Sequence, residues 1–319
     1  MSGKLLFVLL ILIGNYPYCI YSEPITITAV GDNRISHSFI QDRYEEIRLL
    51  SLKGDIIFAN FEGVIVSPTN DQIPFSMPLS VIPILRDIGI NTISLANNHV
   101  SDLGKHAYEF TKKRLTENGF YLSGIDDDGV VIPVKHLKVR LIAFSFTGRN
   151  NVNNIRKAVN IIKQFQEDII IVSAHMGGEN AKGYLIPDGA EYFQNEKRGD
   201  VVAFSRSVID AGADLVLGHG PHVLRRIEIY KQRLIAYSLG NFIFDYPQVN
   251  KNTYAPGAAL TVKLNSEGKF IDGKIACFII RYGIPAPDKS LYALRWIKKL
   301  SSQNDLRVDD AGNILKKGD

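Results

Sequence analysis

The sequence is poor in cysteine, since its 319 residues include only Cys19 and Cys277. Cys19 lies in an N-terminal segment that we expect to be removed on export, which would leave Cys277 as the single thiol. A single thiol forms no internal disulfide, so an exported chain of this kind must draw its stability from a hydrophobic core. With 45% hydrophobic residues, the chain is long enough to build such a core.

An excess of charge of one sign is also missing. The 37 basic and 33 acidic residues give a net charge of +4 and are scattered along the chain. Nucleic-acid-binding proteins gather basic residues on one face, so we expect no nucleic-acid partner. The small basic excess could attract an anionic polymer or a phosphate, and a mixed solvated surface explains it equally well.

The N-terminal apolar run is too short to span a membrane comfortably. Residues 5–13 are all apolar, but these nine residues fall short of the roughly 20 that a spanning helix needs. The run follows Lys4 and leads into Gly14, Pro17 and Ser22, which is the plan of a signal peptide. We therefore predict that residues 1–22 form a signal peptide and that the protein is exported to the periplasm or the cell surface. Cleavage near Ser22 is the favoured outcome, and retention as an N-terminal anchor is the alternative.

Short apolar runs alternate with longer amphipathic segments, as in an α/β or α+β domain. Helical periodicity ends at a glycine after residues 103–118 and again after residues 200–211. We expect one domain over residues 23–285, followed in residues 286–319 by a helix at 291–300 and a mobile polar tail. The expected strands are residues 25–30, 55–60, 92–95, 139–144, 169–175, 215–218, 234–238, 258–264 and 275–281.

Polar residues follow five of these expected strands. The carboxyl ends of strands in parallel or mixed sheets converge on one crevice, where ligands bind. Each residue alone fits a turn or a loop in which its polar groups are hydrogen-bonded. Five such clusters in one place need further bonding partners for their imidazoles and carboxylates, and a metal ion is such a partner. Carboxylates, carboxamides and imidazoles together suit zinc, manganese or iron better than calcium or magnesium. The candidate metal ligands are Asp32, Asn60, Glu62, Asn98, His175, His219 and His222.

His219 and His222 give the strongest local signal, because the Gly220-Pro221 turn between them can aim both imidazoles the same way. The alternative is a strand-ending loop with two surface histidines. His175 ends a buried apolar strand, which favours a ligand role. Glu179, four residues later, would orient a ligand or take a proton, and a charged loop residue is an equal alternative.

His99 and Asp102 are candidates for proton transfer beside the metal. The Asn98 oxygen would bind the metal, His99 would face the substrate as an acid, and Asp102 would fix the tautomer of His99. Asn97 or Asp102 could also cap the helix that starts near residue 103, and both roles can hold at once.

Other charged residues allow two interpretations each. Arg34 and Arg149 could clamp an anionic substrate, although exposed arginines need no such role. The three carboxylates at residues 126–128 fit a solvated loop, with a calcium site as the alternative.

The motifs resemble those of the CapA family, the poly-gamma-glutamate capsule synthesis proteins, whose domain belongs to the metallophosphatase-like superfamily. The resemblance implies a four-layer α-β-β-α sandwich, an extracytoplasmic location, and a role in making, exporting or trimming a cell-surface polymer. It also implies that Asn241 lines the substrate site. The matching motifs include Gly31-Asp32, Ala59-Asn60-Phe61-Glu62, Ser94-Leu95-Ala96-Asn97-Asn98-His99, Gly218-His219-Gly220-Pro221-His222 and Tyr237-Ser238-Leu239-Gly240-Asn241-Phe242.

The sequence departs from the metallophosphatases at two positions of the site. Arg34 stands where they have a histidine, and Ala59-Asn60 stands where they have a bridging aspartate, which leaves Asn60 or Glu62 to substitute. A carboxamide attracts a second cation less strongly than a carboxylate does. We therefore expect one or two divalent metal ions, of Mn, Zn or Fe.

Our hypothesis is a metal-dependent hydrolase of a phosphoester or an amide, in which a cation activates water and His99 protonates the leaving group. Its partner would be an anionic cell-surface polymer or a small phosphoester, with membrane-associated capsule or envelope machinery as a further partner. The competing hypothesis is a non-catalytic component that binds or exports the polymer.

Overall fold

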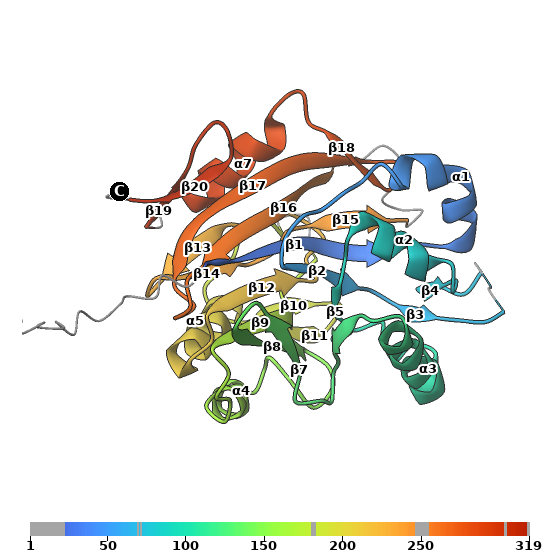
Figure 1. Ribbon diagram of the computed structural model, residues 1–319, viewed down its shortest axis with the longest axis horizontal. Coiled ribbons are helices and arrows are strands. Elements are labelled where there is room, and N and C mark those ends of the chain that lie inside the picture. Colours follow the sequence, from blue (N-terminus) through green and yellow to red (C-terminus); the bar gives the residue numbers. More distant parts are fainter. Residues whose placement is uncertain are drawn as a thin grey trace, which may run out of the picture.

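Two large β-sheets pack face to face, and helices cover their outer faces (Figure 1). The computed structural model describes residues 23–68, 70, 72–179, 183–245, 255–302 and 305–317. The expected signal peptide lies outside the described residues and stays a prediction. Among the helices of these ranges, none is both long and apolar enough to cross a membrane.

The first sheet begins with the N-terminal strand of the domain. Its order is β19-β20-β17-β16-β1-β2-β5-β6, with β15 also paired to β1 and β18 to β17. Strands β1, β2, β5 and β6 run parallel to one another, whereas β16 is antiparallel to β1. The bounds are β1 (Ile25–Arg34), β2 (Ile56–Phe61), β5 (Thr92–Ser94), β6 (Tyr121–Ser123), β15 (Asn241–Phe244), β16 (Ala255–Leu264), β17 (Phe270–Arg281), β18 (Ile284–Pro287), β19 (Leu306–Val308) and β20 (Asn313–Lys316).

The second sheet comes from the middle of the chain. Its order is β13-β14-β12-β9-β8-β7, with a parallel centre and an antiparallel strand at each edge. Two short pairs, β3 with β4 and β10 with β11, lie outside the large sheets. The bounds are β7 (Val130–Val134), β8 (Leu137–Ser145), β9 (Ile169–His175), β12 (Leu215–His219), β13 (Ile227–Tyr230), β14 (Arg233–Ala236), β3 (Val64–Ile65), β4 (Ser76–Met77), β10 (Glu191–Phe193) and β11 (Glu196–Gly199).

Alternating side chains give each sheet two apolar faces. On β2, Phe58 belongs to the core between the sheets, whereas Ile57 packs under the helices. On β9, Ile171 and Ile170 divide in the same way. Because successive side chains of a strand point to opposite faces, a strand covered on both sides is apolar throughout. The predicted four-layer α-β-β-α sandwich is confirmed.

Helices α1, α2 and α3 pack on the first sheet, and α4 and α5 pack on the second. The Asp200 side chain accepts a hydrogen bond from the Ala203 amide and so caps α5, which ends at Gly212 as its sequence predicts. The expected capping of α3 by Asn97 or Asp102 is wrong, because Leu103 is the N-cap residue and makes no side-chain cap bond. The bounds are α1 (His37–Ile47), α2 (Val81–Ile88), α3 (Gly104–Glu117), α4 (Ile155–Ile162), α5 (Val201–Ala211) and α7 (Tyr292–Ser301).

The C-terminal segment differs from the expected mobile tail. Helix α7 confirms the predicted helix, but β19 and β20 then join the first sheet beside β17. Leu306, Val308 and Ile314 are buried in the core between the sheets. Arg307 separates Leu306 from Val308, and this alternation is typical of a strand with one buried face, although the high polarity of the segment masks it.

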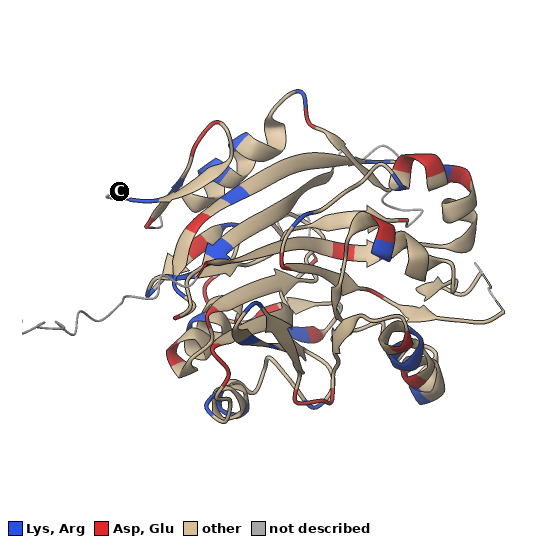
Figure 2. Cartoon of the chain, in the orientation of Figure 1, with Lys and Arg blue, Asp and Glu red and all other residues tan. Residues whose placement is uncertain are grey.

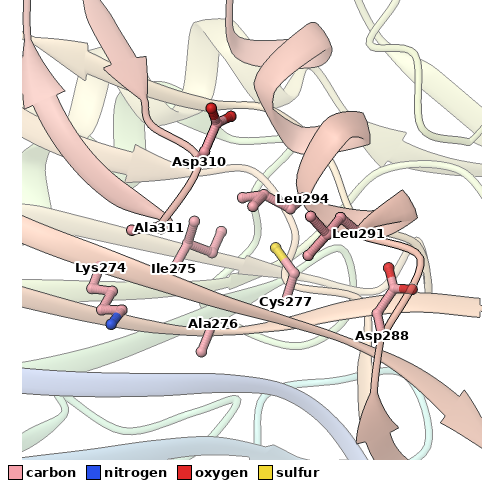
Figure 3. A pocket seen from close by; sticks show the side chains of 9 residues that line it. All are labelled: Lys274, Ile275, Ala276, Cys277, Asp288, Leu291, Leu294, Asp310 and Ala311. Carbon is pink, nitrogen blue, oxygen red and sulfur yellow. The ribbon is translucent and has the colours of Figure 1, made fainter.

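Cys277 lies on β17 and faces a small pocket beside α7. The pocket has a volume of about 180 Å³, and Leu291 and Leu294 also line it (Figure 3). Burial, assisted by the charge of Asp288, raises the pKa of Cys277 to about 12. Cys277 is a free cysteine, as the sequence predicts for the mature chain.

Charged residues of both signs are interspersed over the helices and strand ends (Figure 2). The acidic loop at residues 126–128 is more ordered than a solvated loop, because the Asp127 carboxylate accepts bonds from the amides of Gly124 and Gly129. Arg149 pairs with Asp128 and donates to the Asp126 carbonyl, so this arginine is committed to the acidic loop.

Candidate metal centre

The site forms where the ends of both sheets meet. In the first sheet Asp32 on β1 lies opposite Asn60 on β2, and in the second sheet His175 on β9 lies opposite His219 on β12. Nδ1 of His219 lies 4.0 Å from Oδ1 of Asp32, so the two sheets contribute to one cluster. The chain topology therefore brings together residues that are more than 180 positions apart in the sequence.

A glycine before Asp32 makes this close approach possible. A Cβ atom on Gly31 would lie 1.7 Å from the carbonyl oxygen of Gly240. The amide of Asp32 donates to that same carbonyl at 3.0 Å. Any side chain at Gly31 would push β1 away from the segment that carries Asn241.

Asp32, Glu62 and His175 form the centre of the cluster. One ligand atom from each lies within 4.8 Å of the others, and all three side chains are buried. Both Glu62 oxygens, Nε2 of His175 and both nitrogens of His219 are buried without a hydrogen-bond partner in the described part of the chain. Unpaired buried polar atoms are costly, and a divalent cation is the partner that carboxylate and imidazole donors share. The residues present therefore fit a divalent metal ion.

Two imidazoles of the cluster are held neutral. Burial lowers the pKa of His175 well below its ordinary value and lowers that of His219 to about 4, although the Asp32 charge opposes both shifts. A neutral imidazole keeps the lone pair that a metal ligand requires. Both histidines are thus in the protonation state that binds a cation.

His222 lies between the two carboxylates. Its Nδ1 is 3.2 Å from Oδ2 of Asp32, and its Nε2 is 3.4 Å from Oε1 of Glu62. Burial alone would lower the pKa of His222, but the charges of Glu62 and Asp32 outweigh it and raise the pKa well above the ordinary value. Nδ1 also lies 2.9 Å from Oδ1 of Asn241, which places Asn241 beside the cluster.

The two carboxylates respond differently to burial. Burial would raise the pKa of Asp32, but the hydrogen bond and charge of His222 outweigh it, and the pKa lies below the ordinary value. For Glu62, burial dominates and the charges of Asp32 and Glu179 add to it, so the pKa is raised well above the ordinary value. Two neighbouring carboxylates with opposite shifts are typical of a functional site.

Asn60 turns its nitrogen, not its oxygen, towards the cluster. The Asn97 amide is fixed by two backbone bonds, since its nitrogen donates to the Phe61 carbonyl and its oxygen accepts from the His99 amide. The same Asn97 nitrogen donates to the Asn60 oxygen at 3.3 Å, so the Asn60 nitrogen donates to Asp32 at 2.7 Å. In this orientation Asn60 orients a ligand, and the expected ligand role would require its amide to turn over.

His99 and Asp102 are paired as the sequence predicts. Nδ1 of His99 lies 2.8 Å from Oδ2 of Asp102, and Nε2 lies 3.0 Å from the Asn98 nitrogen and 3.9 Å from Oε1 of Glu62. The Asn98 oxygen is buried and has no hydrogen-bond partner among the described residues, which leaves it available as a ligand. Burial lowers the pKa of His99, although the bond to Asp102 acts in the opposite direction.

An aromatic ring that the sequence analysis missed covers His99. The Phe75 ring stacks on His99 with a centroid distance of 3.3 Å and an interplanar angle of 6°. The Arg34 guanidinium lies 5.4 Å from the centroid of the same ring, and its Nη1 lies 3.9 Å from Oδ2 of Asp245. Arg34 is therefore on the wall of the site. Nothing in the local sequence around Phe75 signals this contact, because Phe75 precedes β4 in a separate short strand pair.

Glu179 reaches the cluster from the loop after β9. Its Oε2 lies 3.7 Å from Nε2 of His222, and its Oε1 accepts a hydrogen bond from Arg198 at 2.9 Å. Arg198 is buried and its guanidinium carbon lies 4.0 Å from the centroid of the Phe146 ring. The sequence analysis missed Arg198, because it stands in a short polar hairpin with no periodic signal.

Comparison with known proteins identifies a family. The family model "Bacterial capsule synthesis protein PGA_cap" matches residues 26–246. The "Capsule biosynthesis protein CapA" of Bacillus anthracis is 23% identical over 265 residues, or 70% of this chain and 61% of that protein. The "PGA biosynthesis protein CapA" of Bacillus subtilis (strain 168) is 25% identical over 337 aligned positions, or 91% of this chain and 84% of that protein. The match thus spans about three fifths of the first relative's length, and these findings confirm the resemblance that the motifs predict.

A solved structure shares the fold. A hypothetical protein from Thermus thermophilus superposes with a TM-score of 0.52 and 13% sequence identity, covering 80% of this chain and 99% of that chain. At this level of identity the likeness concerns the fold alone.

Proposed function

Because the chain belongs to the bacterial capsule synthesis family, we propose that it is an exported, metal-dependent hydrolase that acts on a phosphoester or an amide. The observation that carries this proposal is the buried group of Asp32, Glu62 and His175 next to the His99–Asp102 pair. A purely structural role would not explain why these potential metal ligands are buried together. The substrate that we propose is an anionic cell-surface polymer or a small phosphoester.

The protein residues divide into those that hold a cation and those that move a proton. Asp32, Glu62, His175, His219 and, after loss of its proton, His222 would hold the cation, and the orphaned oxygen of Asn98 would complete the set. When bound, a divalent cation supplies Lewis acidity and lowers the pKa of a bound water. The neutral state of His175 and His219 supports ligation without prior loss of a proton.

His99 is the residue that we assign to the leaving group. Asp102 accepts the Nδ1 proton, which fixes the ring so that Nε2 faces the Asn98 amide and the Glu62 carboxylate. In the described geometry Nε2 accepts from the Asn98 amide, so His99 would first take up a proton at Nε2 from solvent as the substrate displaces that amide, and would then deliver it to the departing oxygen or nitrogen. Stacking on Phe75 restrains the ring plane during this transfer.

The substrate would approach along the wall formed by Arg34 and Asn241. Arg34 offers a planar guanidinium that suits a phosphate or a carboxylate. Export, with residues 1–22 cleaved or retained as an anchor, would bring the site to a surface polymer and to membrane-associated envelope machinery. N-terminal sequencing of the exported protein tests this part, with a start near Glu23 expected after cleavage.

Metal content and turnover test the proposal together. We expect the purified protein to contain Mn, Zn or Fe by elemental analysis, and the His219→Ala/His222→Ala double variant to lose it. With the metal-loaded protein, His99→Ala should lower the turnover of a phosphoester such as p-nitrophenyl phosphate about 100-fold or more, without loss of the metal. His136→Ala, at an exposed histidine in the β7–β8 turn, is the matched control.

Two outcomes would contradict the proposal. A protein that binds no metal after reconstitution is not a metal-dependent hydrolase, and polymer binding that resists chelation would then favour the non-catalytic role. Turnover that His99→Ala leaves unchanged would remove His99 from the mechanism.

A further inference from the structure

A fully buried ion pair lies next to the metal centre but contributes no ligand to it. Arg225 and Glu191 are both buried, and the two guanidinium nitrogens Nη1 and Nη2 donate to the two carboxylate oxygens at 2.7 Å each. The Arg225 side chain also donates to the carbonyls of Gly178 and Gly183. The Glu191 carboxylate accepts a further bond from the Gly178 amide at 2.9 Å.

These bonds connect two loops of the site. Arg225 lies three residues after His222, in the segment that follows β12. Gly178 directly precedes Glu179, in the segment that follows β9, and Glu191 closes that segment at the start of β10. The pair thus fastens the loop that carries His222 to the loop that carries Glu179.

The room for the guanidinium comes from a glycine. Gly177 has φ of +92°, and a Cβ atom there would lie 2.6 Å from Nη1 of Arg225. A left-handed backbone at this position favours glycine in any case. The loop after β9 is therefore shaped around the Arg225 head group.

Stability alone does not account for such a pair. Removing two charges from water is costly, and apolar residues of similar size often stabilise a protein equally well or better. The ion pair instead fixes the relative positions of the groups that it bonds, because the planar guanidinium donates to several acceptors in a set geometry. Here those acceptors belong to both loops.

We propose that Arg225 and Glu191 are positioning residues that hold the two loops in register, so that Glu179 and His222 face each other across 3.7 Å. This inference rests on the proposed function, because it assumes that Glu179 and His222 serve the metal centre. Neither Arg225 nor Glu191 is among the residues that would hold the cation in the proposed function.

The Arg225→Met/Glu191→Leu double variant tests the proposal in the full chain. We expect its Mn²⁺ dissociation constant, measured by titration calorimetry, to rise about tenfold or more. Its melting temperature should fall only modestly, because the apolar pair leaves the Gly178 and Gly183 backbone groups unpaired but removes two buried charges. Hydrogen exchange should accelerate in residues 176–179 and 220–225 but not in the core strands. Arg140→Met/Glu167→Leu is the matched control, since this partly buried pair with an N–O distance of 2.6 Å lies at the outer side of β8.

Arg225→Lys keeps the charge but loses the fork, and it supplies the test if the double variant does not fold. If Arg225 has a positioning role, the Arg225→Lys variant should bind Mn²⁺ more weakly than the unaltered protein. If only the positive charge is needed, the two proteins should bind Mn²⁺ with equal affinity. Unchanged Mn²⁺ affinity and unchanged exchange in both loops would overturn the proposal. If the unaltered protein binds no Mn²⁺, the proposed function fails, and the exchange rates of the two loops still decide whether the pair fastens them.

Discussion

Asn60 lies beside Asp32 in the site, at a position where the sequence predicts a metal ligand. Its orientation follows from a series of hydrogen bonds that starts at the backbone of Phe61 and His99 and passes through Asn97. The sequence shows that Asn60 and Asn97 are asparagines, but it does not show that the side-chain nitrogen of Asn60, and not its oxygen, faces Asp32. At the scale of residues, burial rather than position in a motif decides what each group does.

His219 should make the stability of the metal-free protein depend on pH. Its pKa is about 4 in the folded protein, against an ordinary value of 6.5. Between these values the unfolded chain binds a proton that the folded protein does not, so stability falls as the pH decreases from 6.5 towards 4. The full loss is on the order of 3 kcal/mol, at about 1.4 kcal/mol per pKa unit. Above pH 6.5 His219 is neutral in both the folded and the unfolded protein, so no stability is lost through its protonation.

Urea unfolding in the presence of a chelator, at pH 7.5 and at pH 5, measures this dependence. We expect His219→Gln to have a smaller difference in unfolding free energy between the two pH values than the unaltered protein has. An equal difference in both proteins would show that His219 titrates normally in the folded state.

Elements were predicted well where their periodicity was strong. Residues 169–175 coincide with β9, and the predicted helix at 200–211 differs from α5 by one residue. The C-terminal strands were missed, because the apolar residues of β19 and β20 stand among Asp, Asn and Lys. Pairing with β17 overrides that local polarity.

Ile314→Ala tests the role of the C-terminal strands. Ile314 is buried in the core between the sheets, so we expect a loss of about 2 to 4 kcal/mol in the free energy of unfolding. Chemical denaturation monitored by Trp296 fluorescence measures it. Lys317→Ala, at an exposed position of the same segment, should change stability very little, and an equally small effect of Ile314→Ala would support a mobile tail instead.

The whole molecule is held together by three apolar cores and by no disulfide in its described residues. One core lies between the sheets, and one lies under each set of helices. The candidate metal centre lies where the ends of both sheets converge, and the Arg225–Glu191 pair bonds to the loops at that edge. The apolar stabilisation therefore comes from core residues outside the site, and site residues such as His219 add a pH-dependent contribution.

The absence of a disulfide should be visible in solution. We expect the melting temperature of the mature protein to be the same with and without a reductant, because the single thiol makes no cross-link. Cys277 should react slowly with a thiol reagent at pH 8 in the folded protein and rapidly after unfolding, since burial raises its pKa to about 12. Rapid reaction of the folded protein would contradict the packing of Cys277 between β17 and α7.

The sequence by itself determined the fold class, the family and the residue types of the site, because strand periodicity and polar strand ends are local features. Only the tertiary structure decided which of these residues meet, that Asn60 presents its nitrogen, and that Arg198, Phe75 and the Arg225–Glu191 pair support the site. The physical reason is that parallel strand order and loop packing join residues far apart in the chain. Contacts of that kind depend on the whole sandwich, and no window of neighbouring residues encodes them.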